Sequence, residues 1–550
     1  MARTDTIRFY DRALSRLSRR ELLNISWKLG TAAMLQPIAP ATAFAQPLFR
    51  SYPFALGVAS GDPWPDSVVL WTRLAPEPFA GGGMPMANVE VSWQVAADPR
   101  FSSVVRSGTA VARPELGHSV HVEAGGLQPA REYWYRFRCG AEVSQTGRTR
   151  TAPAAGAAVD RLRFGVCGCG HYETGYFTAY GRVADENFDF IFHTGDYIYE
   201  GRGDVGRNPN SVRQHLGQEI YTLVDYRNRY AQYKSDPDLM AAHLSAPMIV
   251  TWDDHEVDND YAGDLDEHDA PPEVFLLRRA AAYQAYYETM PLRASAMPSG
   301  PHLPLHRRLQ FGKLIDLNVL DTRQYRSKQA CNLSSQPSCT AAMGDPARTM
   351  LGAAQEKWLF DNLATGSGTW TVLGQQVPTF ARDNRGTNPE ARFSVDKWDG
   401  YTAARQRLFQ RLHDTKAANP IVLSGDVHTH WCADLKMDFA DPKSDTVGVE
   451  FTNTSVTSGG DGSDSQPNWE RLQADNPHLT YHSNKRGYIA CTATPATMQA
   501  DFKVIDRVTV RGDAARTAAT RIVQAGKPGS AAPAKVAGSA TLFTTFTVTS

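Results

Sequence analysis

Three short clusters of acidic and histidine residues each follow an apolar, strand-like run. They lie in segments 188–200, 249–261 and 421–431, where stretches rich in Ile, Val and Phe run into Asp, His or Tyr. In a layered α/β fold, side chains beyond the carboxyl ends of strands converge on one crevice. Gathering several carboxylates in one place is costly unless cations neutralise them. The three clusters together therefore predict a metal site.

The first cluster, Gly-Asp-Tyr-Ile-Tyr-Glu, places Asp196 directly after an apolar strand and a glycine. Its carboxylate is expected to project from the strand tip, and Tyr199, three residues later, can reach back to the same point. A phenolate ligand favours a hard trivalent ion such as Fe³⁺, whereas zinc sites prefer nitrogen and sulfur. Taken alone, the same pair also fits a helix cap followed by a packed aromatic residue.

The second cluster, Trp-Asp-Asp-His-Glu-Val-Asp-Asn-Asp-Tyr, contains five acidic residues and one histidine. Runs of Asp are usually solvated loops, but the apolar run before this one makes its first two acids the end of a buried strand. We predict Asp254 as a metal ligand and His255 as a contact to the transition state. Asn259 is a candidate neutral oxygen ligand, and the later aspartates are expected to be solvated.

The third cluster places Asp426 and His428 two residues apart at a strand end, so both can lie on one face. His430 is expected to support these ligands rather than to bind the metal.

A fourth cluster, Val-Cys-Gly-Cys-Gly-His-Tyr-Glu, contains Cys167, Cys169 and His171. This spacing fits a redox pair, half of a zinc site or neither, and a thiolate at a strand end beside a metal would be a ligand.

The elements that position these clusters divide the chain of 550 residues into two or three domains. From 54 to 151, short alternating strands broken by Gly and Pro predict a small all-β sandwich. After an Ala-, Pro- and Gly-rich linker, strands and helices alternate from 160 to about 510, which predicts a layered α/β domain. Residues 511–550 are expected to form a C-terminal extension that is weakly structured from 521 to 539.

The N-terminus resembles a targeting segment over residues 1–45. Arg19 and Arg20 precede a mildly apolar run, and Ala43-Phe44-Ala45 supplies a small-x-small cleavage pattern. This order is typical of a twin-arginine signal, so we expect the export machinery as a partner and a periplasmic or secreted protein. An uncleaved amphipathic helix is the alternative. No later stretch approaches the roughly 18–20 apolar residues that a membrane span needs.

Charge and the remaining cysteines add two further expectations. The formal net charge of −1 argues against nucleic acid as an electrostatic partner. Cys331 and Cys339 flank a polar loop, where an exported protein can keep a disulfide.

Taken together, the clusters resemble the metallophosphoesterase arrangement and, more closely, the PhoD family of alkaline phosphatases, which are exported by the twin-arginine route. The resemblance continues through segments 53–74, 320–326, 398–401, 454–462 and 484–488, and so covers nearly all of the chain after the signal.

The resemblance implies a four-layer αββα metallophosphoesterase sandwich, an α/β fold, behind an N-terminal immunoglobulin- or fibronectin-like domain. It also implies a site that holds one Fe³⁺ together with Ca²⁺ ions. Carried over position by position, the implied ligands are Cys169, Asp196, Tyr199, Asp253, Asp254, Asp426 and His428. Cys167 departs from the family, where a small residue is more usual, and it could oxidise with Cys169.

The activity that the resemblance implies is the metal-dependent hydrolysis of phosphomonoesters, and also of phosphodiesters, by an exported alkaline phosphatase. The cations would act as Lewis acids on the phosphate oxygens. His255 or Arg323 would stabilise charge on the transferring group or the leaving oxygen. Arg323 is equally open to interpretation as a structural salt-bridge partner.

Three alternatives stay open at this stage. The first is a calcium-dependent phosphodiesterase of the phospholipase D type, acting on phospholipids with the same metals. The second is a secreted binding protein whose β-sandwich docks glycans or partners while the metals are structural. The third is a zinc hydrolase that uses Cys167, Cys169 and His171.

Overall fold

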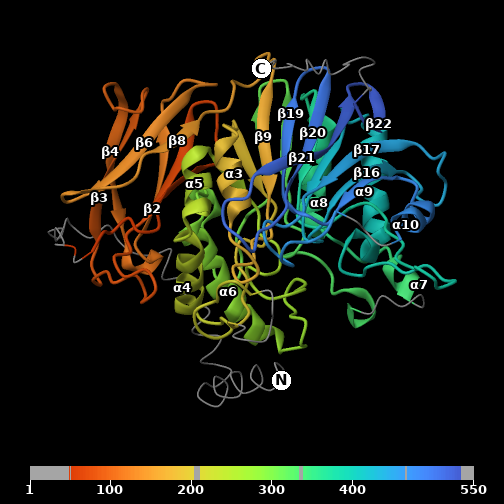
Figure 1. The fold of residues 1–550 in the computed structure, drawn as a ribbon, viewed down its shortest axis with the longest axis horizontal. Coiled ribbons are helices and arrows are strands. Elements are labelled where there is room, and N and C mark those ends of the chain that lie inside the picture. The colour runs from red at the N-terminus through yellow and green to blue at the C-terminus, as the bar shows by residue number, and fades with distance from the viewer. Residues whose placement is uncertain (1–48, 50, 204–210, 334–338, 465–467, 534–550) are drawn as a thin grey trace, which may run out of the picture.

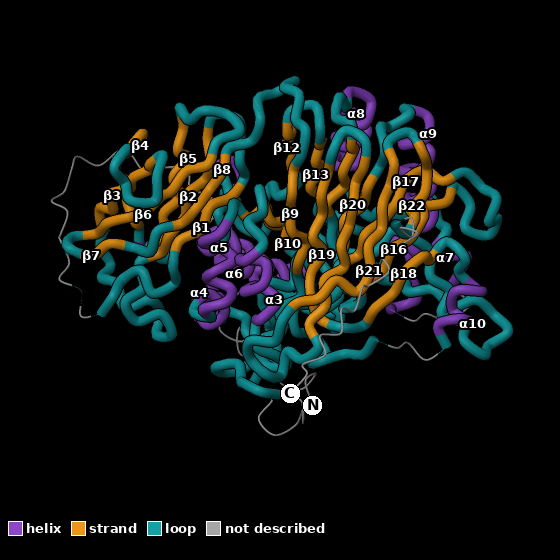
Figure 2. The backbone as a smooth tube through the Cα atoms, turned by 45° about the horizontal axis from the view of Figure 1, so that its top comes forward, coloured by secondary structure: helices purple, strands orange, loops and turns teal. Residues whose placement is uncertain are grey.

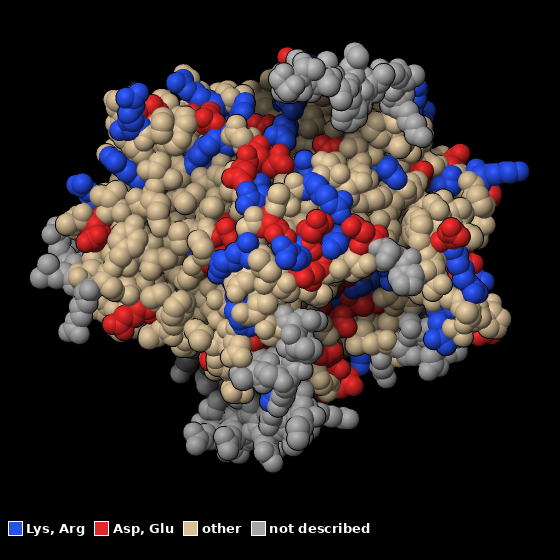
Figure 3. Space-filling model, viewed as in Figure 1, with Lys and Arg blue, Asp and Glu red and all other residues tan. Residues whose placement is uncertain are grey.

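The computed structural model describes residue 49 and residues 51–203, 211–333, 339–464 and 468–533 (Figure 1). The predicted signal segment, 1–45, lies outside these ranges. Within them, every helix is too short or too polar to cross a membrane. Figure 3 shows acidic and basic side chains interspersed over the viewed face, as the near-zero net charge leads us to expect.

The N-terminal domain is a β-sandwich, as the short alternating strands predict. Antiparallel strands β1 (Val58–Gly61), β2 (Ser67–Arg73) and β5 (Ser119–Gly125) form one sheet. The other sheet contains β3 (Val89–Ala96), β4 (Val104–Ala112), β6 (Glu132–Cys139), β7 (Glu142–Val143) and β8 (Gly147–Arg150). Alternate residues such as Val68, Leu70, Val91 and Phe137 form the core between the two sheets.

Two seven-stranded mixed sheets form the centre of the larger domain. The first has the order β11-β10-β9-β19-β20-β21-β22, and its strands β9, β10 and β11 are parallel. Its bounds are β9 (Leu162–Cys167), β10 (Phe190–His193), β11 (Met248–Val250), β19 (Arg486–Ala493), β20 (Thr497–Ile505), β21 (Ala515–Gln524) and β22 (Lys527–Ala531).

The second sheet has the order β12-β13-β14-β15-β17-β16-β18, and its strands β13, β14, β15 and β17 are parallel. Its bounds are β12 (Arg307–Phe311), β13 (Ile315–Val319), β14 (Trp370–Gly374), β15 (Ile421–Ser424), β16 (His430–Lys436), β17 (Thr446–Thr452) and β18 (Leu479–Ser483).

The two sheets pack face to face, and helices cover their outer faces (Figure 2). Phe164 and Val166 of one sheet contact a cluster that includes Leu317 and Val372 of the other. The outer face of the first sheet is covered by α3 (Thr178–Asp185), α4 (Leu223–Lys234), α5 (Pro237–Ser245) and α6 (Pro272–Thr289). The outer face of the second is covered by α8 (Gly352–Thr365) and α9 (Thr402–Asp414). The predicted four-layer αββα sandwich is therefore confirmed.

Shorter helices lie within the loops of both domains. They are η1 (Pro114–Leu116), η2 (Ala294–Ala296), η3 (Ala330–Leu333), η5 (Trp398–Tyr401), α7 (Thr340–Met343) and α10 (Trp469–Asp475). The structure pairs Cys331 with Cys339 in a disulfide whose Cα atoms are 6.0 Å apart.

The expectation that the chain is weakly structured from 521 to 539 is wrong for residues 521–531. These residues lie in β21 and β22, which extend the first sheet. Their Ala- and Thr-rich composition resembles a linker, but β21 pairs along the length of β20, and its Val523 is buried between the sheets. Order here comes from non-local backbone pairing, which composition does not reveal.

Candidate metal centre

Loops at the carboxyl ends of parallel strands in both sheets bring the four sequence clusters together. Cys169 follows β9 and Asp196 follows β10, while Asp253 and Asp254 follow β11. Asp426 and His428 follow β15 of the opposite sheet. The predicted crevice therefore lies where the two sheets face each other.

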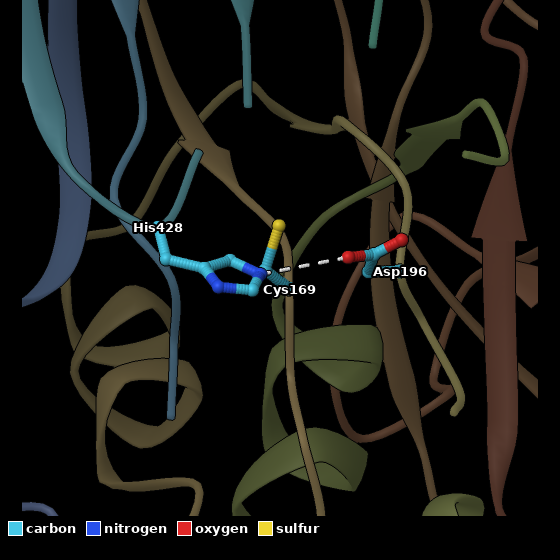
Figure 4. Close-up of side chains that lie close together, drawn as sticks. All are labelled: Cys169, Asp196 and His428. Atoms are coloured by element: carbon cyan, nitrogen blue, oxygen red, sulfur yellow. Dashed lines mark ion pairs between the residues drawn. The ribbon is translucent and has the colours of Figure 1, made fainter. Parts of the chain in front are cut away.

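Three groups of possible metal ligands share members, so they form one continuous centre. In each group the ligand atoms lie within 4.8 Å of one another. The groups are Cys169 with Asp196 and His428, Asp196 with Asp254 and His255, and Asp253 with Asp254 and Asp426. Figure 4 shows the His428 ring and the Asp196 carboxylate turned toward each other, with 3.7 Å between Nε2 and Oδ2.

The Tyr199 hydroxyl lies at the first of these groups. It donates to Asp196 Oδ2 over 2.9 Å and lies 3.1 Å from His428 Nε2. Ser458, to which the sequence motifs assigned no role, places its hydroxyl 2.5 Å from the same oxygen. The phenol is thus within reach of a cation held by its neighbours.

Buried carboxylate oxygens without partners indicate that the donor set fits cations. Within the described ranges, Asp196 Oδ1, Asp253 Oδ2 and Asp254 Oδ1 are buried and accept no hydrogen bond. A buried carboxylate oxygen without a partner is unfavourable, and a bound cation would stabilise it. Burial raises the pKa of the Cys169 thiol well above its ordinary value, and the nearby carboxylates raise this pKa further. A bound cation would reverse that shift by stabilising the thiolate.

Four of the candidate ligands have a strained backbone. The φ angles are 57° at Cys169, 52° at Asp196, 68° at Asp426 and 52° at His428. This left-handed region is uncommon for residues with a Cβ and costs roughly 1–2 kcal/mol at each. Such strain typically accumulates where side chains must converge on a ligand.

Two glycines allow the loops to approach one another. A Cβ on Gly195, where φ is 110°, would lie 2.5 Å from the Asp253 backbone nitrogen. A Cβ on Gly425 would lie 2.4 Å from Thr194 Oγ1. The glycine that precedes each aspartate is therefore a packing requirement of the centre.

Glu256 holds two of the ligand loops together. Its carboxylate accepts hydrogen bonds from the backbone N–H groups of Asp196 (3.2 Å), Tyr197 (2.5 Å) and Asp253 (2.8 Å). The residue lies within the second sequence cluster, but its contacts to the β10 loop depend on the parallel pairing of β10 with β11.

The variant Glu256→Gln is expected to lose about 1–3 kcal/mol of unfolding free energy, because a neutral amide leaves buried N–H donors poorly satisfied. Urea unfolding followed by circular dichroism measures this loss, and turnover should fall together with stability. The exposed Glu77→Gln variant is the matched control. Equal stability of the two variants would contradict this role.

Arg323 lies at the centre of an acidic network. Its side chain is fully buried, and Nε donates to Asp253 Oδ1 over 2.5 Å. Nη1 donates to both oxygens of Asp396 at 3.0 and 3.1 Å, while Nη2 lies 3.3 Å from Asp426 Oδ1. These contacts are those of a salt-bridge partner that neutralises the ligand carboxylates.

Asp396 and Lys397 extend this network, and the sequence clusters missed both. Lys397 contacts Asp426 directly and lies 3.1 Å from Asp396 Oδ2. The only local signal is their position just before the Trp-Asp-Gly-Tyr motif at 398–401. Burial favours the protonated form of Asp254, but the charges of Arg323 and His255 outweigh it and hold its pKa below the usual range.

His255 presents one ring nitrogen to a buried acid. Nδ1 lies 2.7 Å from Glu200 Oε2, and the ring packs against that of Tyr199 with 4.1 Å between centroids. Burial would lower the pKa of His255, but Glu200 and the ligand carboxylates outweigh burial and raise it well above its ordinary value. With its side chain 20 % exposed, the cationic ring is accessible from the crevice.

Asn259, predicted as a neutral oxygen ligand, contacts Glu200 and Glu267 rather than the acidic residues of the three ligand groups. Its backbone N–H donates to Glu200 Oε1 (3.0 Å) and its side-chain amide donates to Glu267 Oε2 (2.8 Å). His430 also faces elsewhere, since its ring accepts a hydrogen bond from the Thr454 backbone and lies 3.2 Å from the Lys503 carbonyl. The Asp258 carboxylate, expected to be solvated, is instead buried and paired with Arg278 at 2.9 Å.

The alternative zinc site does not assemble in the described part of the chain. Cys167 is buried in the apolar layer under α3, beside Phe177 and Val183. The groups of possible metal ligands there contain Cys169 but neither Cys167 nor His171.

An αββα sandwich with carboxylate, histidine and thiol donors at facing strand ends defines a metal-dependent hydrolase of the metallophosphoesterase type. The family model "PhoD-like phosphatase" matches residues 164–502, and the model "PhoD-like phosphatase, N-terminal domain" matches residues 39–153. The chain belongs to the PhoD-like phosphatase family and is a phosphoric ester hydrolase of that type.

A comparison with a characterised protein and one with a solved structure extend this match over most of the chain. The chain is 49 % identical over 486 residues to alkaline phosphatase D of Bacillus subtilis (strain 168), covering 88 % of this chain and 83 % of that protein. A solved structure titled "Structure of PhoD" superposes with a TM-score of 0.86 at 48 % identity, covering 89 % of this chain and 93 % of the other. The resemblance inferred from the sequence motifs is thus confirmed.

Proposed function

We propose that this phosphatase is an exported enzyme that hydrolyses phosphomonoesters with the help of bound Fe³⁺ and Ca²⁺. The observation that carries the proposal is the continuous set of three ligand groups in which buried carboxylate oxygens lack partners. A thiol and a phenol beside Asp196 suit iron, whereas the oxygen-only group of Asp253, Asp254 and Asp426 suits calcium. Bound there, the cations would supply Lewis acidity to the phosphate and to the attacking oxygen.

The chain's own residues would position these components. Cys169, Asp196, Tyr199 and His428 would hold the iron, and Asp253, Asp254 and Asp426 the calcium. Arg323, enclosed by four carboxylates, would keep these acids ionised and oriented. We therefore assign it a positioning role rather than contact with substrate, and Asn259 a supporting role beside Glu200.

His255 would donate to a substrate oxygen and stabilise negative charge as the ester bond breaks. Glu200 fixes its Nδ1, so the other ring nitrogen is available to the crevice. The same geometry suits a leaving alkoxide that needs a proton.

The variant His255→Gln is expected to lower kcat about 100-fold, because a neutral amide cannot supply that charge or proton. Steady-state kinetics should show the loss mainly in kcat, with KM less affected. Glu200→Gln should lower kcat in the same direction but less, since it acts only through His255. The exposed His413→Gln variant is the control, and an unchanged kcat in His255→Gln would refute the assignment.

Export by the twin-arginine route remains part of the proposal. The order of arginine pair, apolar run and cleavage pattern in residues 1–45 supports it, as does the benefit of loading metal before export.

A substrate panel with metal analysis tests the function. p-Nitrophenyl phosphate, its bis-ester and phosphatidylcholine are compared with and without calcium, and metals are measured in protein from its native compartment. We expect the monoester to be turned over fastest and all turnover to stop after chelation. Preference for phosphatidylcholine would favour a phosphodiesterase of the phospholipase D type. Bound metal without turnover of any ester would favour a binding protein.

A further inference from the structure

A basic pocket lies at the seam between the two domains. It has a volume of about 370 Å³ and is lined by Arg148, Arg150, Arg161 and Arg163 together with Glu132, Asn187 and Asp189. Figure 3 shows basic and acidic side chains gathered over the upper part of the viewed face, between β8 and β9. Residues from both domains therefore build one site.

The alternation of side chains along β8 and β9 places the four arginines on the side of each strand that faces the boundary between the domains. Gly147 and Thr149 of β8 are buried, which leaves Arg148 and Arg150 together on the other face. Leu162 is likewise buried at the start of β9, and Arg161 and Arg163 flank it on the opposite side. The pocket lies at the amino end of β9, whereas Cys169 follows its carboxyl end. A strand of six residues spans about 20 Å, so the pocket is separate from the metal centre.

The two acidic residues that line the pocket are already paired with arginines. Asp189 accepts from Arg150 Nη1 at 2.5 Å and from the Arg163 backbone N–H at 2.8 Å. Glu132 accepts from Arg148 Nε at 2.6 Å. Arg163 Nη2 is paired with Glu186 Oε2 at 2.7 Å, so four guanidinium groups face three carboxylates and leave a formal charge of +1. In the part of the chain that the structure describes, Arg161 makes no hydrogen bond or ion pair, so donors are in surplus.

We propose that this pocket binds a tetrahedral oxyanion such as inorganic phosphate. Guanidinium groups recognise oxyanions through paired N–H donors, and several of them can share one anion. The remaining charge of +1 favours an anion, and the unpaired Arg161 guanidinium can present two parallel N–H donors to the oxygens of a phosphate or sulfate ion. Because β8 and β9 belong to different domains, the anion would also tie the domains together.

Calorimetric titration of the metal-loaded full chain with inorganic phosphate tests the proposal. Compared with Arg161→Gln, the wild type should bind one additional phosphate per chain. If the variant still binds this phosphate, its Kd should be at least about 10-fold higher, a difference of about 1.4 kcal/mol. The variant should fold normally and keep its kcat/KM for p-nitrophenyl phosphate, because Arg161 is exposed, unpaired and distant from the metals. Arg161→Lys keeps the positive charge but loses the paired N–H donors of the guanidinium group, so this variant should bind phosphate with intermediate affinity.

Control titrations distinguish phosphate binding at this pocket from phosphate binding elsewhere on the protein. The exposed Arg113→Gln variant should titrate like the wild type. Sulfate should reproduce the extra binding event, and succinate should not. Identical phosphate titrations of the wild type and Arg161→Gln would overturn the proposal, and equal binding of succinate would overturn the assignment to a tetrahedral oxyanion.

Discussion

Replacing Asp196 with Asn is expected to lower phosphatase activity by about 1,000-fold or more, equivalent to about 4 kcal/mol of barrier. Asp196 belongs to two of the three ligand groups, so one change weakens both. The variant keeps the shape of the side chain but removes its charge. Iron and calcium measured by elemental analysis should therefore fall together with kcat.

Stability of the metal-free protein separates the role of Asp196 as a ligand from a structural role. After chelation, Asp196→Asn should be at least as stable as the wild type, because it removes a buried carboxylate whose Oδ1 has no partner. Thermal unfolding of both chelated proteins measures this. Asp66→Asn, an exposed site in the N-terminal domain, serves as the control. Full activity with unchanged metal content would remove Asp196 from the centre.

Replacing Cys169 with Ala is expected to abolish activity and iron binding while calcium falls less. The Cys169 thiol lies in one ligand group with Asp196 and His428, and it is the soft donor of the centre. Calcium takes oxygen ligands, so a calcium site should not depend on sulfur directly. Elemental analysis of iron and calcium in the purified variant, together with kcat, distinguishes the two ions.

Cys167 supplies a control two residues away. It is buried among apolar side chains under α3, so Cys167→Ala should cost about 1 kcal/mol of stability and leave iron and activity intact. Equal loss of iron in the two cysteine variants would instead support the zinc-type arrangement that uses both sulfurs.

Local sequence signals predicted the strand ends of this site well. Short apolar runs that end in Gly-Asp specify where Asp196 and Asp426 leave their strands, because apolar burial and the glycine requirement act within a few residues. Parallel strands then place such ends at one edge, so general rules for layered α/β folds predicted that the clusters meet. The N-terminal sandwich was predictable for a similar reason, from its period-two alternation.

Contacts between distant segments were decided only by the tertiary structure. Asp396 meets Arg323 across 73 positions, and Lys397 meets Asp426 from a loop without any strong motif. Strand β21 gains its order from pairing with β20, and β22 from pairing with β21, although their composition resembles a linker.

The amino-acid sequence by itself therefore determined the donor types, their places at strand ends and the layered fold that brings them together. Only the tertiary structure decided which donors share a group, which acids are neutralised by Arg323, and which backbones are held at positive φ. The physical reason is that apolar periodicity and turn chemistry act over a few residues. Pairing of charges and the strain at Cys169 or Asp196 instead depend on packing between chain segments that lie far apart in sequence.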